Sequence, residues 1–202
     1  MKIVLFGLTG DPVTSAHREI IQRLSDTYDK VIVIPTNVNY YKNYKGHDRA
    51  MFSFTERYDN LVSECEPFDN VIVSDIERNI TDGWRFWHTL NQIKTENGPE
   101  NDYYIAMGSD SLQNFKTWYN WEEIYKNTKL VVFNRPGYTD NFPTDIEYEY
   151  LDMNNTISST EVRQNLMALM KKFEDKIEDD DFDDLLDDMT WAKDYNALLT
   201  KE

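Results

Sequence analysis

Short apolar segments rich in β-branched residues alternate with amphipathic stretches along most of the chain. The apolar segments cover residues 2–6, 30–35, 70–74, 103–107 and 129–133. Stretches with one apolar helical face lie between or after them, at residues 15–24, 55–62, 84–93 and 160–170. Apolar runs without polar alternation are typical of parallel strands buried on both faces. The order therefore predicts an α/β fold with a doubly wound, Rossmann-like parallel sheet, which binds ligands outside the carboxyl ends of its strands.

Charge divides the chain near residue 173. Residues 174–202 contain twelve acidic side chains and three lysines, so they carry −9 of the total charge of −16. We therefore expect an α/β domain at residues 1–173 and an acidic extension at residues 174–202. Apolar residues along one side of the extension predict an acidic amphipathic helix that packs on the domain. A solvated, partly disordered tail fits the same composition, and the sequence leaves both alternatives open.

The overall charge and the cysteine content exclude several classes of protein. A net charge of −16 and a pI near 4.5 disfavour binding to nucleic acid or to an anionic membrane. Cys65 is the only cysteine, so no intramolecular disulfide can form, and no Cys or His cluster has the spacing of a zinc site. No run of about 18 uncharged apolar residues predicts a membrane span. We expect a cytoplasmic protein without a structural metal.

The first candidate site is the turn after the first apolar segment, at residues 7–17. Gly7 and Gly10 allow the backbone to turn tightly, and a helix that begins near Thr14 would direct its N-terminal N–H groups above the sheet. Such a helix end is suited to a phosphate. Thr14 and His17 are three residues apart, so both side chains would project from the first turn and converge on one anion. A capping or surface role for His17 explains the same pattern.

The second candidate site lies at residues 157–163, after residues 147–153, which are compatible with a further strand. Its hydroxyl residues stand directly before an apolar helical pattern and predict a strong N-cap. If Ser159 is the cap, Arg163 follows one turn later and can fold back to the helix N-terminus, where its guanidinium suits a phosphate. Capping alone accounts for the hydroxyls but not for Arg163. Two helix N-termini that face one cleft could bind a triphosphate.

These motifs resemble those of a known enzyme family. The first turn is similar to the GxFxPxHxxH-type element of the nucleotidylyltransferase superfamily. The second site is similar to the ISSTxxR element of nicotinate and nicotinamide mononucleotide adenylyltransferases. Further similarity to the bacterial nicotinate mononucleotide enzymes, in content and in order, occurs at residues 107–112, 117–118, 121–124, 130–133 and 135–137. The resemblance covers the chain from its first residue to about residue 170 and leaves out the acidic extension.

The resemblance implies a nicotinate-nucleotide adenylyltransferase, in which the 5′-phosphate of nicotinate mononucleotide attacks the α-phosphorus of ATP in line. The products would be deamido-NAD and pyrophosphate. The catalytic residues that it implies are Thr14, His17 and Arg163. The implied ATP contacts are Gly7, Leu8, Thr9, Ser158, Ser159 and Thr160. The implied mononucleotide contacts are Asp110 at the ribose, Trp118 against the pyridine ring, and Thr89, Lys42 and Lys45. We add Arg85 as a candidate contact because of its charge.

The resemblance also implies a magnesium ion, which would enter with ATP and be held mainly by phosphate oxygens. The sequence offers no carboxylate cage that would hold a metal by itself. ATP and a pyridine mononucleotide are the expected partners, and the formation of a homo-oligomer is left open.

The base-recognition segment departs from the family pattern. Where the bacterial nicotinate enzymes carry a Tyr-Thr-x-x-Thr-Leu-like stretch, residues 85–90 are RFWHTL, and only Thr89 and Leu90 match. Arg85 would pair with a nicotinate carboxylate and favour the acid over the amide. Gly10 also stands where the family usually has Phe. Three alternatives stay open: an enzyme specific for nicotinamide mononucleotide, a phosphopantetheine adenylyltransferase, and a nucleotide-binding protein without catalytic activity. The phosphopantetheine enzymes lack an arginine at the position of Arg163, which argues against the second alternative.

Overall fold

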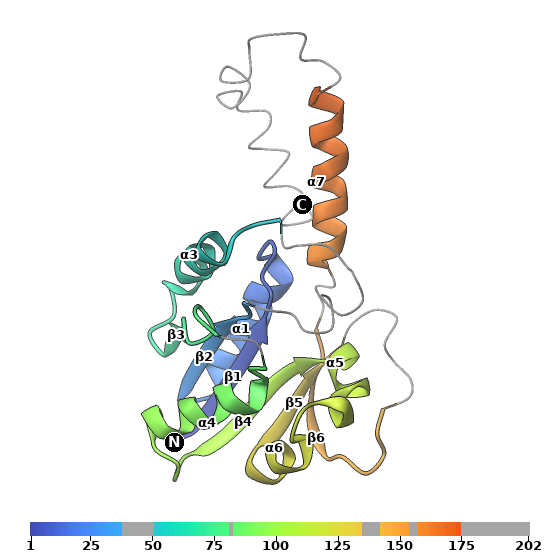
Figure 1. Ribbon diagram of the computed structural model, residues 1–202. Helices are drawn as coiled ribbons and strands as arrows, with labels where there is room; N and C mark the ends of the chain where they lie inside the picture. Colours follow the sequence, from blue (N-terminus) through green and yellow to red (C-terminus); the bar gives the residue numbers. More distant parts are fainter. Residues whose placement is uncertain (38–50, 81–82, 135–141, 154–156, 175–202) are drawn as a thin grey trace.

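The computed structural model describes residues 1–37, 51–80, 83–134, 142–153 and 157–174, together with the side chains of all these residues except 169–174. Within these residues, six parallel strands form one sheet in the order β3-β2-β1-β4-β5-β6 (Figure 1). The strands are β1 (Lys2–Leu8), β2 (Lys30–Pro35), β3 (Val71–Val73), β4 (Asp102–Gly108), β5 (Lys129–Phe133) and β6 (Tyr148–Leu151). The strand order reverses between β1 and β4, which confirms the doubly wound fold expected from the sequence.

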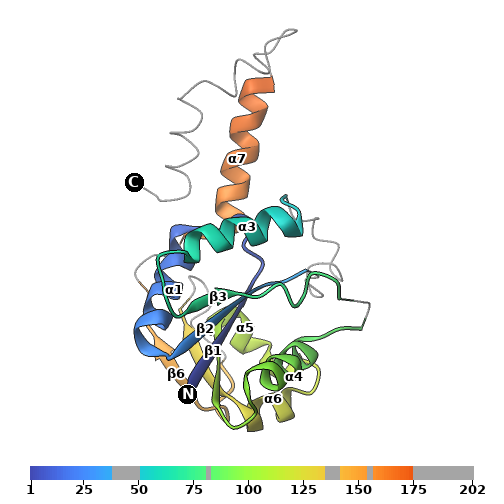
Figure 2. The same ribbon diagram turned by 90° about the vertical axis from the view of Figure 1, so that its left-hand side faces the viewer.

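Helices cover both faces of the sheet (Figures 1 and 2). They are α1 (Ser15–Thr27), α3 (Phe54–Cys65), α4 (Phe86–Asn97), α5 (Ser109–Gln113), α6 (Trp121–Asn127) and α7 (Ser159–Glu174), with a short 3₁₀ helix at Phe115–Thr117. The sequence pattern predicted α1, α3, α4 and α7, with ends that differ from the observed ones by a few residues. It did not predict α5 and α6, because helices of 5 and 7 residues are too short to display a helical period.

β1 is buried on both faces at the centre of the sheet. Its side chains Val4, Phe6 and Leu8 pack into the core shared with α1 and α3. Ile3 and Leu5 pack into the opposite core, which is shared with α4, α5 and α6. The continuous apolar run in the sequence thus reflects helices on both sides of the strand. Because β1 pairs with β2 on one side and β4 on the other, its carboxyl end opens at the point where the strand order reverses.

α7 projects away from the body of the sheet, as both ribbon views show (Figures 1 and 2). Near its start, Val162 packs with Ala16 of α1 and with Ile157. Residues 175–202 lie outside the described part of the chain, so the domain boundary at residue 173 and both alternatives for the acidic extension stay predictions. Among the described residues, no helix is both long and apolar enough to cross a bilayer.

Candidate functional site

The carboxyl end of β1 carries the first candidate turn. Gly7 is exposed, Leu8 ends the strand and is buried, and Thr9 is half-buried after it. The Leu8 carbonyl accepts a hydrogen bond of 2.9 Å from the backbone N–H of Thr36, which ties the ends of β1 and β2 together. A side-chain carbon added at Gly7 would meet the Phe86 ring at 4.0 Å. The first turn of α4 therefore lies beside the end of β1.

Thr14 and His17 form a buried pair at the start of α1. The backbone N–H of Thr14 donates to Nδ1 of His17 at 3.1 Å, and the Thr14 hydroxyl lies 2.9 Å from the same nitrogen. Because a backbone N–H only donates, Nδ1 is unprotonated, and the neutral ring carries its proton on Nε2. The two side chains lie together as expected from their spacing, and their convergence on an anion stays a prediction. The structure also contains the capping contact that was the alternative explanation for His17.

Ser158 is the N-cap of α7. Its Oγ accepts a hydrogen bond of 3.1 Å from the backbone N–H of Glu161, and its carbonyl accepts one of 3.1 Å from Val162. The cap thus lies one residue earlier than the Ser159 cap that we considered from the sequence. The physical reason is that the Ser159 hydroxyl has another partner, since it donates to the carbonyl of Pro12 at 2.8 Å.

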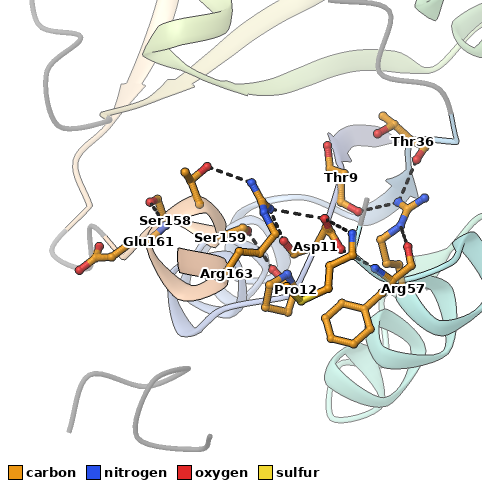
Figure 3. A network of polar contacts seen from close by, with 12 residues as sticks. Thr9, Asp11, Pro12, Thr36, Arg57, Ser158, Ser159, Glu161 and Arg163 are labelled. Carbon is orange, nitrogen blue, oxygen red and sulfur yellow. Dashed lines mark hydrogen bonds and ion pairs between the residues drawn. The ribbon is translucent and has the colours of Figure 1, made fainter. Parts of the chain in front are cut away.

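The two candidate turns meet, although 147 residues separate the partners Pro12 and Ser159. Arg163 of α7 makes a second connection, because its Nη1 donates to the carbonyl oxygen of Asp11 and lies 3.5 Å from Asp11 Oδ2 (Figure 3). Its Nη2 donates to the Thr160 hydroxyl at 3.1 Å. Arg163 therefore folds back to the N-terminus of its own helix, as predicted, and contacts the first turn at the same time.

Arg57 supports the first turn and was not identified in the sequence. Its guanidinium donates to the carbonyl oxygens of Thr9 at 2.7 Å, Thr36 at 2.9 Å and Phe52 at 3.2 Å (Figure 3). The side chain is 3% exposed. Burial lowers the pKa of Arg57, and the negative charge of Asp11 opposes that shift. In the sequence Arg57 looks like any other residue of α3, and two of its three carbonyl partners, Thr9 and Thr36, are distant in the chain, so no local signal indicated its role.

Asp11 is the second residue that the sequence analysis missed. Its carboxylate accepts hydrogen bonds of 3.0 Å from the backbone N–H groups of both Met51 and Phe52. It also forms the ion pair with Arg163. A single aspartate in a loop is an ordinary turn residue, and only the folded chain shows that Asp11 connects the first turn, the start of α3 and the start of α7.

Asp110 and Trp118 follow β4 on the other side of the point where the strand order reverses. Asp110 is half-buried in the first turn of α5. Trp118 is also half-buried, and its ring packs against those of Phe86 at 5.4 Å and Phe115 at 5.5 Å, measured between ring centroids. Trp118 therefore packs against the core that β1 shares with α4, α5 and α6. Its neighbour Phe86 lies beside Gly7 at the end of β1. Binding of a ribose by Asp110 and of a pyridine ring by Trp118 stay predictions.

Thr89 is fully buried and lies in the middle of a hydrogen-bonded chain. Its hydroxyl accepts from Trp84 Nε1 at 2.8 Å and donates to Glu77 Oε1 at 2.8 Å. Burial raises the pKa of the Glu77 carboxyl, and the hydrogen bond from Thr89 partly opposes that shift. Arg85 is half-buried and donates to the Trp84 carbonyl at 2.6 Å. Base recognition by Arg85 and Thr89 stays a prediction.

The remaining expected contacts, Lys42 and Lys45, lie outside the described residues. In the part of the chain that the structure describes, no group of three or more His, Cys, Asp or Glu side chains could hold a metal ion. A pocket of about 370 Å³ lies next to the base-recognition segment and is lined by Asp75, Ile76, Asn79, Ile80, Trp84 and Gln92. None of the predicted site residues lines it.

Comparisons with known proteins agree with this architecture. The model of a family described as cytidylyltransferase-like matches residues 5–165. A curated protein of Aliarcobacter butzleri, named "Probable nicotinate-nucleotide adenylyltransferase", is 29% identical over 168 residues, which are 82% of this chain and 88% of the relative. One of the same name from Fusobacterium nucleatum is 29% identical over 181 residues, covering 82% of this chain and 88% of its own.

The solved structures show the same fold at lower sequence identity. The Plasmodium falciparum nicotinic acid mononucleotide adenylyltransferase complexed with NaAD superimposes with a TM-score of 0.64 at 18% identity, over 81% of this chain and 82% of that one. Its complex with APC gives a TM-score of 0.60 at 16% identity over the same shares. These similarities support the fold.

Proposed function

Because the chain belongs to the cytidylyltransferase-like family, we propose that it is a nicotinate-nucleotide adenylyltransferase. It transfers AMP from ATP to nicotinate mononucleotide and releases deamido-NAD and pyrophosphate. The names of its relatives and the NaAD bound to a protein of the same fold support this substrate class. One structural observation carries the proposal: the turn that leads into His17 and the N-terminus of α7 meet through Ser159 and Arg163.

The reaction needs placement of charge more than a reactive side chain. An oxygen of the mononucleotide 5′-phosphate forms a bond to the α-phosphorus of ATP, the bond from that phosphorus to the β-phosphate oxygen breaks, and pyrophosphate leaves with the electron pair. Donors that are already held in place stabilise the charge on the transferring group without a covalent intermediate. The site supplies an imidazole, a guanidinium and two helix N-termini.

Each of these groups has a distinct task in the proposal. His17 holds an α-phosphate oxygen through Nε2–H, because its Nδ1 is occupied by the backbone N–H of Thr14. Arg163 and the first backbone N–H groups of α7 bind the leaving phosphates. The Ser159 hydroxyl donates to Pro12, so this residue serves best through its backbone N–H and through the docking of α7. Trp118 and Asp110 are proposed to contact the mononucleotide.

A magnesium ion accompanies ATP in this proposal and neutralises part of the triphosphate charge. The described site residues offer N–H donors rather than a carboxylate cluster, which fits a metal ion that is held by phosphate oxygens and water. We further propose that the enzyme works in the cytoplasm, since a chain with one buried cysteine, Cys65, suits a reducing compartment.

The direct test measures pyrophosphate release from ATP with nicotinate mononucleotide and, side by side, with nicotinamide mononucleotide and phosphopantetheine. We expect the highest kcat/KM with the nicotinate nucleotide, and mass spectrometry should identify deamido-NAD as the product. A higher kcat/KM with either of the other acceptors would change the substrate assignment. Release of no pyrophosphate with any acceptor would leave a nucleotide-binding protein without this activity.

The variant His17→Ala tests the proposed mechanism. We expect kcat to fall about a hundredfold or more, the order found when one preorganised donor is removed. The free energy of unfolding should also fall by about 1 kcal/mol, because a hydrogen bond at the start of α1 is lost. His88→Ala is a matched control for stability, since Nδ1 of His88 accepts the backbone N–H of Arg85 at 3.0 Å in the same position of α4. Normal turnover of His17→Ala would remove this residue from the mechanism.

A further inference from the structure

We propose that Asp11 is a positioning residue that orients Arg163 toward the polyphosphate of ATP. The inference rests on the proposed function for its chemistry and on the hydrogen bonds of Asp11 for its geometry. Asp11 is 3% exposed, so its carboxylate is removed from water and needs partners within the protein. Its partners are backbone groups from one part of the chain and a guanidinium from another, 152 residues away.

The Asp11 carboxylate is itself held in place. Oδ1 accepts from the backbone N–H of Phe52 and Oδ2 from that of Met51, both at 3.0 Å. Two hydrogen bonds from adjacent backbone groups fix the plane of the carboxylate. Oδ2 is the oxygen that also lies 3.5 Å from Arg163 Nη1. The carboxylate therefore presents a fixed negative charge to Arg163.

Arg163 is held from both ends of its guanidinium. Nη1 contacts the carbonyl oxygen and Oδ2 of Asp11, while Nη2 donates to the Thr160 hydroxyl at 3.1 Å. Nη2 carries a second N–H bond and Nε carries another, so a guanidinium in this arrangement keeps donors for phosphate oxygens. A side chain with many rotamers is thus ordered before ATP arrives, which removes an entropy cost from binding. Figure 3 shows Arg163 reaching from α7 to Asp11 in the first turn.

The charge of Asp11 acts on two guanidinium groups, those of Arg57 and Arg163. The charge of Asp11 acts on Arg57, whose three carbonyl partners hold the backbone of the first turn and of residues 36 and 52. Arg57 thus fixes the backbone at Thr9, while Asp11 fixes Arg163. The three hydrogen bonds of Arg57 do not involve Asp11, so we expect loss of the Asp11 charge to affect the binding of ATP through Arg163 and to leave the mononucleotide contacts unchanged.

A double-mutant cycle tests this coupling. Asp11→Asn, Arg163→Ala and the double variant are compared with the wild type by the Kd for ATP and by steady-state kinetics. We expect Asp11→Asn to weaken ATP binding and raise KM for ATP at least tenfold, with KM for the mononucleotide within twofold of the wild type. In the Arg163→Ala background the same change should alter both ATP parameters less than twofold.

Two results would overturn the proposal. An equal loss in both backgrounds would mean that Asp11 acts independently of Arg163, and tighter ATP binding by Asp11→Asn would mean that Asp11 competes with phosphate for the guanidinium. Asp145→Asn is the control for loss of one carboxylate, because Asp145 pairs with Lys116 at 2.6 Å on the surface, away from this network. It should leave both ATP parameters unchanged.

Stability and activity can be separated in this experiment. If Asp11→Asn does not fold, Asp11→Glu takes its place in the cycle. This variant keeps the charge but displaces it by one methylene group. It should raise the Kd for ATP when Arg163 is present and leave it unchanged in the Arg163→Ala background. The Kd is measured without an acceptor nucleotide. A wild-type protein that binds ATP with this coupling but shows no turnover would therefore refute the proposed function and retain the role of Asp11.

Discussion

Replacing Arg57 with methionine removes three hydrogen bonds to backbone carbonyls at and near the first turn. The guanidinium donates to the carbonyl oxygens of Thr9, Thr36 and Phe52, at distances of 2.7 to 3.2 Å. Methionine fills a similar volume but leaves all three carbonyls without this donor. The variant therefore separates the contribution of polar contacts from that of packing.

The expected cost follows from these three contacts. A carbonyl that loses its partner in a buried setting costs about 1–3 kcal/mol. The three residues that supply the carbonyls are half-buried, so water can reach part of them, and we use the lower end of that range for each. Burial lowers the pKa of Arg57, so removing its charge also relieves a desolvation cost, which is a second reason to take the lower end for each carbonyl. The net loss should be about 3 kcal/mol in the free energy of unfolding.

Urea unfolding followed by circular dichroism measures this loss. For a chain of this size about 3 kcal/mol corresponds to a fall in Tm of roughly 6–12 °C. Arg57→Lys should lie between the wild type and Arg57→Met, because one ammonium group cannot reach three carbonyls in a fork.

The matched control is Arg18→Met. Arg18 pairs with Glu64 at 3.4 Å, its side chain is 55% exposed, and an exposed pair contributes about 0–1 kcal/mol. A loss for Arg57→Met that equals the loss for Arg18→Met would refute the argument that the three carbonyl contacts stabilise the first turn.

Three further measurements test other parts of the structure. Ser158→Ala removes the hydroxyl that caps α7 through the N–H of Glu161, so the free energy of unfolding should fall by about 1 kcal/mol; an unchanged urea midpoint would contradict the cap. Burial raises the pKa of Glu77 above 4.5 in the folded state, so the stability linked to its protonation is fully present below pH 4.5 and is lost as the pH rises through the folded-state pKa. Glu77→Gln cannot ionise but can still accept from Thr89, and its stability should decline less over that pH range than that of the wild type; parallel profiles would exclude Glu77 as the source. Burial raises the pKa of Cys65 to about 11, so Ellman's reagent at pH 8 should label it only after unfolding, and prompt labelling of the native protein would contradict its burial.

The sequence pattern predicted the scaffold because its signals are local. A parallel strand buried on both faces needs a continuous apolar run, and a long surface helix needs an apolar stripe, so the five expected strands and four longer helices could be located without knowledge of their partners. The same holds for pairs on one helical turn. Thr14 contacts His17 and Thr160 contacts Arg163 because residues three apart on a helix are neighbours wherever the helix lies.

Contacts between distant segments account for the site residues that the sequence pattern missed. Little near Asp11 or Arg57 in the chain indicates their roles, because all of their partners except the Phe52 carbonyl bound by Arg57 lie between 21 and 152 residues away. The choice between Ser158 and Ser159 as the cap of α7 also depends on a distant group, since the carbonyl of Pro12 takes the Ser159 hydroxyl. Local chemistry supplied the donors of the candidate phosphate site, and the packing of α7 against the first turn brought them together.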